Sequence, residues 1–320
     1  IPAECELWFY TNRNVPPGES TDLDVSLRIS ADTSMRHLLA PYKAAFDQHF
    51  PSLRYHPDPR PVAQFAAVAP QLITFENPLG FNGAWRRFDT AIGTARFVDW
   101  MVPRLLRANA AGCIFWTLGG YNPRGAMYRP DFDELPPAVM ANVPALTRGF
   151  KSRGLRVGLC ARPADIVRPH DATTDELYRI SMDHPAEVEM VLNRFRHAMA
   201  MGFDVFYCDT FAMNDQDLKL LQKIRDVVGP DVLLYTELGF DLTLPLAGRY
   251  CEWHENEVAG LSREEYEAMR YLCPDSTWLA KSRTKEVVPA AYAKWGLVPL
   301  VEDFQTPMLP PATRPARTQR

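Results

Sequence analysis

The sequence predicts an α/β fold, a (β/α)8 barrel of the TIM type preceded by a short β-rich extension. Two observations lead to this fold class. Short apolar runs of strand-forming residues alternate with segments in which apolar residues recur at helical spacing. The alternation repeats about every 30 residues over roughly 250 residues, which is the size and element order of such a barrel.

Eight apolar runs locate the predicted strands. They are short, rich in strand-forming side chains and bounded by glycine, proline or polar residues, as expected for buried strands. The first run follows Pro70 and precedes the first helical pattern. The predicted strands lie near residues 72–75, 112–118, 155–160, 204–208, 232–236, 249–253, 277–280 and 297–301.

The segments between these runs have the pattern of amphipathic helices. An apolar stripe from Phe97 to Leu105 occupies one helical face ahead of the second strand. Further along, Asn214 or Asp215 can cap a helix that stops at Gly229, because a short polar side chain favours a helix start and glycine favours a helix end.

A doubly wound open sheet is the structural alternative. Its nucleotide-binding members carry a glycine-rich fingerprint between a strand and a helix. Neither G-x-G-x-x-G nor G-x-x-x-x-G-K-[ST] opens any of the predicted helices. The barrel is therefore the favoured fold.

Three segments are expected along the chain. Residues 1–69 do not follow the repeat and contain two strand-like runs, so they are predicted to form a β-rich extension or cap. Residues 70–303 form the barrel, and residues 304–320 form a polar tail. The chain begins with Ile1 instead of Met, from which we expect a processed or trimmed N-terminus, in either a cytoplasmic or a secreted protein.

Composition excludes several classes of protein. Of the 320 residues, 47% are hydrophobic and 23% charged, which is typical of a compact globular protein and excludes disorder. The net charge of −4, without long runs of either sign, argues against nucleic acid as a partner. No apolar run approaches the roughly 18–20 residues that span a membrane. The oligomeric state is left open.

The six cysteines are predicted to be reduced core residues. They are too few for a disulfide scaffold of this length, and none form a C-x-x-C pair. Four of them lie in or beside predicted strands, where a free thiol packs as a small apolar side chain. These four are Cys113, Cys160, Cys208 and Cys251.

Polar residues that directly follow the strands are the candidates for a functional site, because barrels carry their active sites at the carboxyl ends of the strands. Carboxylates recur there among basic and aromatic side chains. The candidates are Glu76, Asn77, Trp116, Tyr121, Asn122, Arg162, Asp209, Glu237, Glu252, Trp253, His254, Glu255, Lys281, Glu302 and Asp303.

This mixture of side chains suits a carbohydrate ligand. Aromatic faces, here Trp116, Tyr121 and Trp253, stack on sugar rings, while carboxylates accept hydrogen bonds from hydroxyl groups. The less specific interpretation is that the aromatic residues belong to the core. Asp209 could likewise be a helix cap, and Glu237 a partner in a structural ion pair.

Three consecutive segments resemble the α-galactosidase (melibiase-like) superfamily of glycoside hydrolases. They are Gly154-Leu-Arg-Val-Gly-Leu-Cys-Ala-Arg162, Ser181-Met-Asp-His-Pro-Ala-Glu187 and Gly202-Phe-Asp-Val-Phe-Tyr-Cys-Asp209. Together they are similar to the family's third-to-fourth strand region over about 60 residues. The resemblance implies a retaining glycosidase with a barrel fold, with Asp209 as the nucleophile and an acid/base after the sixth strand.

The family's acid is an aspartate, whereas this sequence offers Glu252, Glu255 and Glu257 after the sixth strand. We favour Glu255, because it lies further out in the loop, where a proton donor faces the leaving group. Glu252 is the alternative acid. Retaining hydrolysis needs two carboxylates about 5–5.5 Å apart and neither metal nor cofactor. Arg162 and Lys281 could keep Asp209 ionised or bind substrate hydroxyls.

The predicted function is thus hydrolysis of an α-linked sugar. The remaining predicted substrate contacts are Glu237, His254 and Glu76. A catalytically silent carbohydrate-binding or scaffold barrel is the main alternative, because the fold alone does not imply activity. A metal-dependent hydrolase that uses His254 with Asp209 and Glu237 is a third hypothesis, although the sequence lacks the paired histidine spacing of zinc sites.

Overall fold

The computed structural model describes most of the barrel and part of what precedes it. The described residues are 17–20, 35–66, 90–116, 121–122, 127–128, 137–167, 177–254, 257–259, 263–282, 292 and 295–301. In this part of the chain, no helix is both long enough and apolar enough to cross a membrane.

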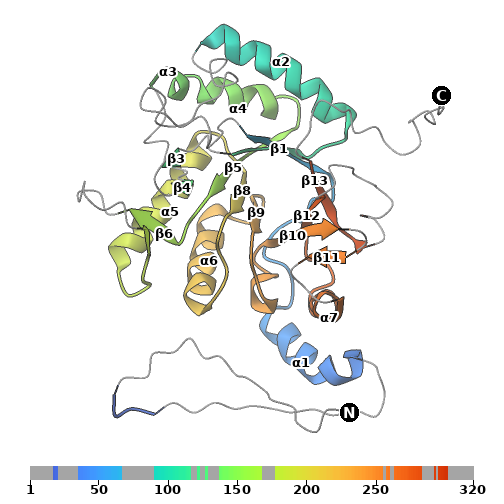
Figure 1. Ribbon diagram of the computed structural model, residues 1–320. Coiled ribbons are helices and arrows are strands. Elements are labelled where there is room, and N and C mark those ends of the chain that lie inside the picture. Colours follow the sequence, from blue (N-terminus) through green and yellow to red (C-terminus); the bar gives the residue numbers. More distant parts are fainter. Residues whose placement is uncertain are drawn as a thin grey trace, which may run out of the picture.

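Eight parallel strands of the described chain close into a barrel, which confirms the predicted fold class (Figure 1). Strand β1 completes the ring, because it pairs with both β2 and β13. In ring order the strands are β1 (Val62–Ala66), β2 (Gly112–Trp116), β5 (Arg156–Ala161), β8 (Val205–Cys208), β9 (Leu233–Thr236), β10 (Gly248–His254), β12 (Trp278–Ser282) and β13 (Val298–Val301). The runs predicted from 112–118 onward each overlap one of these strands.

The first strand lies earlier than expected. The predicted strand at 72–75 lies outside the described residues, and the closing position is held by β1, within the range 1–69 that we assigned to an extension. The register shows that β1 is a barrel strand, because Val62 pairs with Leu300 on one side and with Gly112 on the other. The described part of the extension also includes a helix, α1 (Met35–His49), whereas the predicted strand-like runs lie outside the described residues.

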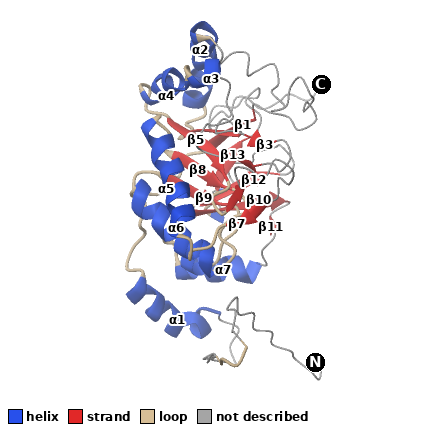
Figure 2. Cartoon of the chain, turned by 90° about the vertical axis from the view of Figure 1, so that its left-hand side faces the viewer, coloured by secondary structure: helices blue, strands red, loops and turns tan. Residues whose placement is uncertain are grey.

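Helices lie outside the strands, and Figure 2 shows α4, α5 and α6 along one side of the sheet. The helices after α1 are α2 (Ala91–Arg107), α3 (Pro137–Met140), α4 (Val143–Lys151), α5 (Pro185–Ala200), α6 (Asp215–Val228), the 3-10 turn η3 (Asp241–Thr243) and α7 (Arg263–Leu272). Short antiparallel strands lie in the connections between barrel elements: β3 (Tyr121–Asn122) pairs with β4 (Met127–Tyr128), β6 (Asp165–Val167) with β7 (Leu177–Arg179), and β11 (Glu257–Ala259) with β10.

Helix α6 begins and ends as its sequence predicts. The side chain of Asn214 accepts a hydrogen bond from the backbone N–H of Asp217 at 3.0 Å, so Asn214 is the N-cap. Gly229 follows the last turn with a φ of 74°, a conformation that glycine adopts without steric cost.

Alternation along each strand divides the core into two layers. In β8, Val205 and Tyr207 belong to a cluster with the buried residues of the other strands, whereas Phe206 and Cys208 pack in the layer beneath the helices. The same alternation in β5 and β9 sends every second side chain into the barrel.

The five described cysteines are buried free thiols, in agreement with the sequence prediction. They are Cys113, Cys160, Cys208, Cys251 and Cys273. Burial raises the pKa of the Cys113 and Cys160 thiols well above the ordinary value, so both stay protonated.

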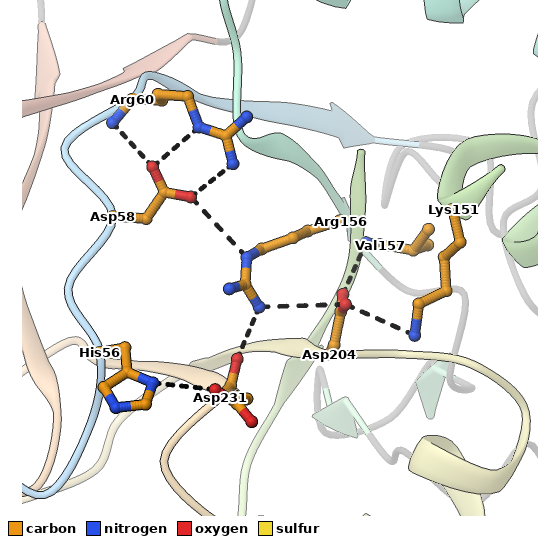
Figure 3. A network of polar contacts seen from close by, with 8 residues as sticks. All are labelled: His56, Asp58, Arg60, Lys151, Arg156, Val157, Asp204 and Asp231. Atoms are coloured by element: carbon orange, nitrogen blue, oxygen red, sulfur yellow. Dashed lines mark hydrogen bonds and ion pairs between the residues drawn. The ribbon is translucent and has the colours of Figure 1, made fainter. Parts of the chain in front are cut away.

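A network of charged residues joins the amino ends of the strands (Figure 3). Arg60 donates to both carboxylate oxygens of Asp58 at 2.9 and 2.7 Å. Arg156, at the start of β5, donates to the backbone carbonyl of Asp231 at 2.6 Å, and Asp204 accepts from the N–H of Val157 at 2.9 Å. Burial alone would raise the pKa of Asp58, but the hydrogen bonds and charge of Arg60 hold that pKa below its ordinary value.

Arg225 anchors the carboxyl end of α6 from within the core. The residue is only 2% exposed. Its guanidinium donates to three backbone carbonyls, those of Leu246 at 2.7 Å, Gly229 at 2.5 Å and Val232 at 2.9 Å. Burial lowers the pKa of Arg225 to about 10, which leaves it charged at neutral pH.

We predict that Arg225→Met lowers the free energy of unfolding by about 2–4 kcal/mol, because methionine preserves the aliphatic stem but leaves buried carbonyls without donors. Urea denaturation monitored by circular dichroism measures the loss. Lys223→Met, on the exposed side of the same helix, is the matched control and should change stability by less than about 0.5 kcal/mol. Equal effects of the two substitutions would contradict the anchoring role.

Candidate functional site

Three predicted site residues meet where neighbouring strands end. Arg162 follows β5, Asp209 follows β8 and Glu237 follows β9, and these strands are adjacent in the barrel. Backbone hydrogen bonds extend the ladder past the strand ends, from Asp209 N–H to Ala161 O at 2.8 Å and from Glu237 N–H to Cys208 O at 2.9 Å. Each of the three side chains also continues the inward alternation of its strand.

An ion pair and two further contacts hold the carboxylates. Arg162 Nε lies 2.9 Å from Asp209 Oδ2. The next residue, Thr210, donates its backbone N–H to Glu237 Oε2 at 2.6 Å. The Thr210 hydroxyl accepts a hydrogen bond from Arg162 Nη2 and donates to Asp209 Oδ2 at 3.5 Å. Arg162, Thr210 and the two carboxylates thus form one connected group.

The environment of Asp209 makes its carboxyl group hard to ionise. Burial is the main cause, followed by the negative charge of Glu237, and together they raise the pKa of Asp209 from 3.8 to about 6. Arg162 and the Thr210 hydroxyl act in the opposite direction. At neutral pH, Asp209 is therefore ionised but close to its titration range.

Aromatic side chains pack inside the barrel below the carboxylates. The rings of Trp116 and Tyr207 lie 4.7 Å apart between centroids, and those of Tyr207 and Tyr250 lie 5.3 Å apart at nearly right angles. Burial, followed by the charge of Glu237, raises the pKa of Tyr207, which stays neutral. Trp116, predicted as a sugar platform, is half-buried at the end of β2 and packs on Tyr207.

The sixth strand contributes candidates whose backbone alone is described. Glu252 pairs in register with Lys281 across β10 and β12, so these two predicted residues are neighbours in the sheet. Trp253 and His254 follow in β10, and their side chains lie outside the described residues. Glu255, our preferred acid, also lies outside them, as does Glu76. Tyr121 is described only as backbone in β3.

Among the described side chains, no group of three or more His, Cys, Asp or Glu residues is arranged to hold a metal ion. The hypothesis of a metal site built on Asp209 and Glu237 also requires the side chain of His254, which lies outside this set.

Sequence reasoning missed Thr210, Tyr207 and Tyr250. The two tyrosines carry a readable signal, because each lies on an inward position of its strand, as Asp209 does two residues after Tyr207. Thr210 gives no such signal, since its role depends on a backbone conformation that a threonine rarely adopts. The sequence analysis also did not predict that two large apolar side chains after the carboxylates, Met213 and Leu238, would be exposed.

No protein-family model matches the sequence, and no curated protein matches it. Solved structures are similar in fold. TtGalA, an α-galactosidase from Thermus thermophilus in complex with p-nitrophenyl α-D-galactopyranoside, superposes with a TM-score of 0.53 at 14% identity, over 84% of this chain and 63% of that one. The isomalto-dextranase of Arthrobacter globiformis T6, complexed with panose, gives 0.49 at 9% identity, over 79% and 56%.

A third similar structure is the cyclic α-maltosyl-(1→6)-maltose hydrolase of Arthrobacter globiformis in complex with maltose, with a TM-score of 0.44 at 13% identity over 80% of this chain and 74% of that one. The chain spans less than two thirds of the length of TtGalA. At 14% identity the likeness to TtGalA shows the fold alone, which agrees with the (β/α)8 barrel described above.

Proposed function

We propose that this chain is a retaining glycoside hydrolase that cleaves an α-linked sugar by double displacement. One observation carries the proposal: the buried carboxylate of Asp209 lies beside Glu237 and is paired with Arg162 at the carboxyl ends of adjacent barrel strands. The shared barrel fold and the similarity of the 154–209 segments to the α-galactosidase superfamily support it.

In this proposal Asp209 is the nucleophile. A carboxylate oxygen of Asp209 bonds to the anomeric carbon while the bond to the leaving oxygen breaks, and the acid protonates that oxygen. Water then attacks the same carbon, gives its proton to the conjugate base of the acid, and releases Asp209. Arg162 keeps Asp209 ionised and oriented despite burial. The planar guanidinium fixes the direction of this contact more tightly than the ammonium group of a lysine would.

The acid in this proposal is Glu255, with Glu252 as the alternative. Glu252 belongs to β10, the strand that pairs with β9, and Glu255 is the next residue in the sequence after β10. Glu237 binds substrate hydroxyls and raises the pKa of Asp209 by its charge. Lys281, Glu76, His254 and the aromatic residues Trp116, Tyr121 and Trp253 complete the proposed sugar site.

Asp209→Asn is predicted to lower kcat/KM on the order of 1,000-fold or more, because an amide cannot form the glycosyl ester. A screen of aryl α- and β-glycosides gives the activity, and mass spectrometry after treatment with a 2-fluoro glycoside locates the covalent adduct. We expect the adduct on Asp209 of the wild-type protein. Asp99→Asn, an exposed position on α2, is the control and should keep full activity.

Absence of turnover and of any adduct across the screened sugars would contradict the proposal and favour a carbohydrate-binding or scaffold barrel. Turnover that survives in Asp209→Asn would instead exclude Asp209 as the nucleophile while leaving the activity class in place.

Azide rescue is predicted to identify the acid. With a dinitrophenyl glycoside, whose leaving group needs no proton, loss of the acid slows only the second step, and azide then attacks the glycosyl-enzyme in place of water. We expect azide to restore turnover in Glu255→Ala, with a glycosyl azide of retained configuration as the product detected by NMR. Rescue of Glu252→Ala or Glu237→Ala instead would contradict the assignment to Glu255 and name the residue that serves.

The charge of Glu237 is predicted to contribute to the acidic limit of activity. Asp209 must be ionised to attack, so kcat/KM should decrease at pH values below about 6. Glu237→Gln removes a like charge that raises the pKa of Asp209 but leaves the larger effect of burial, so the acidic limb should move part of the way from about pH 6 toward lower pH. The pH dependence of kcat/KM measures the change.

Glu189→Gln is the control for this titration, since Glu189 is an exposed carboxylate on α5. An acidic limb that stays near pH 6 in Glu237→Gln would show that Glu237 does not govern the ionisation of Asp209.

A further inference from the structure

We propose that Thr210 is a positioning residue that fixes both carboxylates of the site, with its backbone N–H on Glu237 and its hydroxyl between Arg162 and Asp209. The inference rests on the proposed function, in which these carboxylates take part in the reaction.

Thr210 has an unusual backbone conformation. Its φ is 50°, in the left-handed region, where a side chain branched at Cβ is a genuine outlier. Such conformations are costly and cluster at functional sites. Ala212, two residues later, has a φ of 73°, so the segment that leaves β8 contains two non-glycine residues in this region.

The surrounding contacts hold this segment from several sides. Phe211 and Ala212 are buried, and the carbonyl of Phe211 accepts from Leu238 N–H at 3.2 Å. Further along, Met213 N–H donates to Asp217 Oδ2 at 2.8 Å. A conformation so disfavoured persists only where its surroundings determine it, and these contacts meet that condition.

Asp217 is itself fixed. It is 3% exposed, and Arg179 Nη2, at the end of β7, donates to both of its carboxylate oxygens at 2.7 and 2.6 Å. This ion pair ties the connection after β5 to the first turn of α6, so the segment that contains Thr210 is anchored at its far end as well.

The left-handed φ determines what Thr210 can reach. Because φ sets the angle between the N–H and the side chain, this conformation turns the N–H to Glu237 while the hydroxyl reaches Arg162 and Asp209. One residue thereby contacts both carboxylates and the cation. Removal of the hydroxyl takes a hydrogen bond from the ionised form of Asp209 and leaves the contact to Glu237 in place.

Other groups also act on Asp209, and the test has to separate them from Thr210. Among the described groups, Arg162 faces it from the end of β5 and Glu237 from the end of β9, while the buried Cys160, Tyr207 and Cys208 lie near it in β5 and β8. The two thiols and the phenol stay neutral, so of these five groups only Arg162 and Glu237 are charged near neutral pH.

The first experiment compares Thr210→Val with Thr210→Ser. Valine removes the hydroxyl at nearly constant volume, and serine retains it. We expect the acidic limb of kcat/KM to move to higher pH in Thr210→Val, by about half a pH unit or more, because the ionised form of Asp209 loses a donor. Thr210→Ser should keep the wild-type limb. A wild-type limb in Thr210→Val, or a shifted limb in Thr210→Ser, would overturn the proposal.

The second experiment needs no activity. The pKa of Asp209 is raised by folding, so its ionisation reduces stability as the pH rises from about 4 through about 6. Thr210→Val raises that pKa further, so its loss in Tm should be larger at pH 7 than at pH 4. In an Asp209→Asn background this pH dependence should vanish.

Thr147→Val is the matched control, because the buried Thr147 hydroxyl donates to the Met201 carbonyl at 2.8 Å away from the site. It should lower Tm equally at both pH values. A pH-independent loss of Tm in Thr210→Val would reduce Thr210 to a structural residue and overturn the inference. If no glycoside is hydrolysed by the wild type, the proposed function fails, while this thermal comparison still decides the role of Thr210.

Discussion

The pairing of β1 with β13 is the interaction on which the rest of the structure depends. Parallel strands leave unpaired backbone groups at the two edges of an open sheet, and closure removes both edges. Here Val62 pairs with Leu300 on one side and with Gly112 on the other, so the ladder is continuous. Because all eight strands are parallel, their carboxyl ends lie at one rim of the closed barrel. Arg162 and Glu237, far apart in the sequence, come close together there because β8 pairs with both β5 and β9.

The ionisation of Asp209 at this rim depends on opposing electrostatic effects. Burial and the charge of Glu237 favour the neutral form of Asp209, whereas Arg162 and the Thr210 hydroxyl favour the anion. The outcome is a carboxylate that is charged at neutral pH but poorly solvated. The four groups follow three adjacent strands, β5, β8 and β9, so the balance depends on the barrel register as much as on residue type.

Much of the fold and part of the site could be predicted from the sequence. Apolar runs identified seven of the barrel strands, because buried parallel strands are apolar throughout. The first strand was missed, since Val62–Ala66 contains Gln64 and its identity depends on pairing with residues at the other end of the chain. In the site, Asp209, Arg162 and Glu237 followed from the rule that barrels react at strand ends. Thr210 could not, because a left-handed backbone is imposed by tertiary contacts.

The charged network at the amino ends of the strands has a consequence for how such a protein can change over time. Asp58, Arg60, Arg156 and Asp204 join β1, β5 and β8 at the end of the barrel opposite the carboxylates (Figure 3). Stability and chemistry are therefore encoded by separate sets of residues. Loops at the carboxyl ends of the strands can lengthen, shorten or exchange side chains without disturbing the contacts that keep the strands in register. This separation makes the scaffold evolvable: a lineage can explore new ligands by substitution in its loops while the barrel beneath them stays folded.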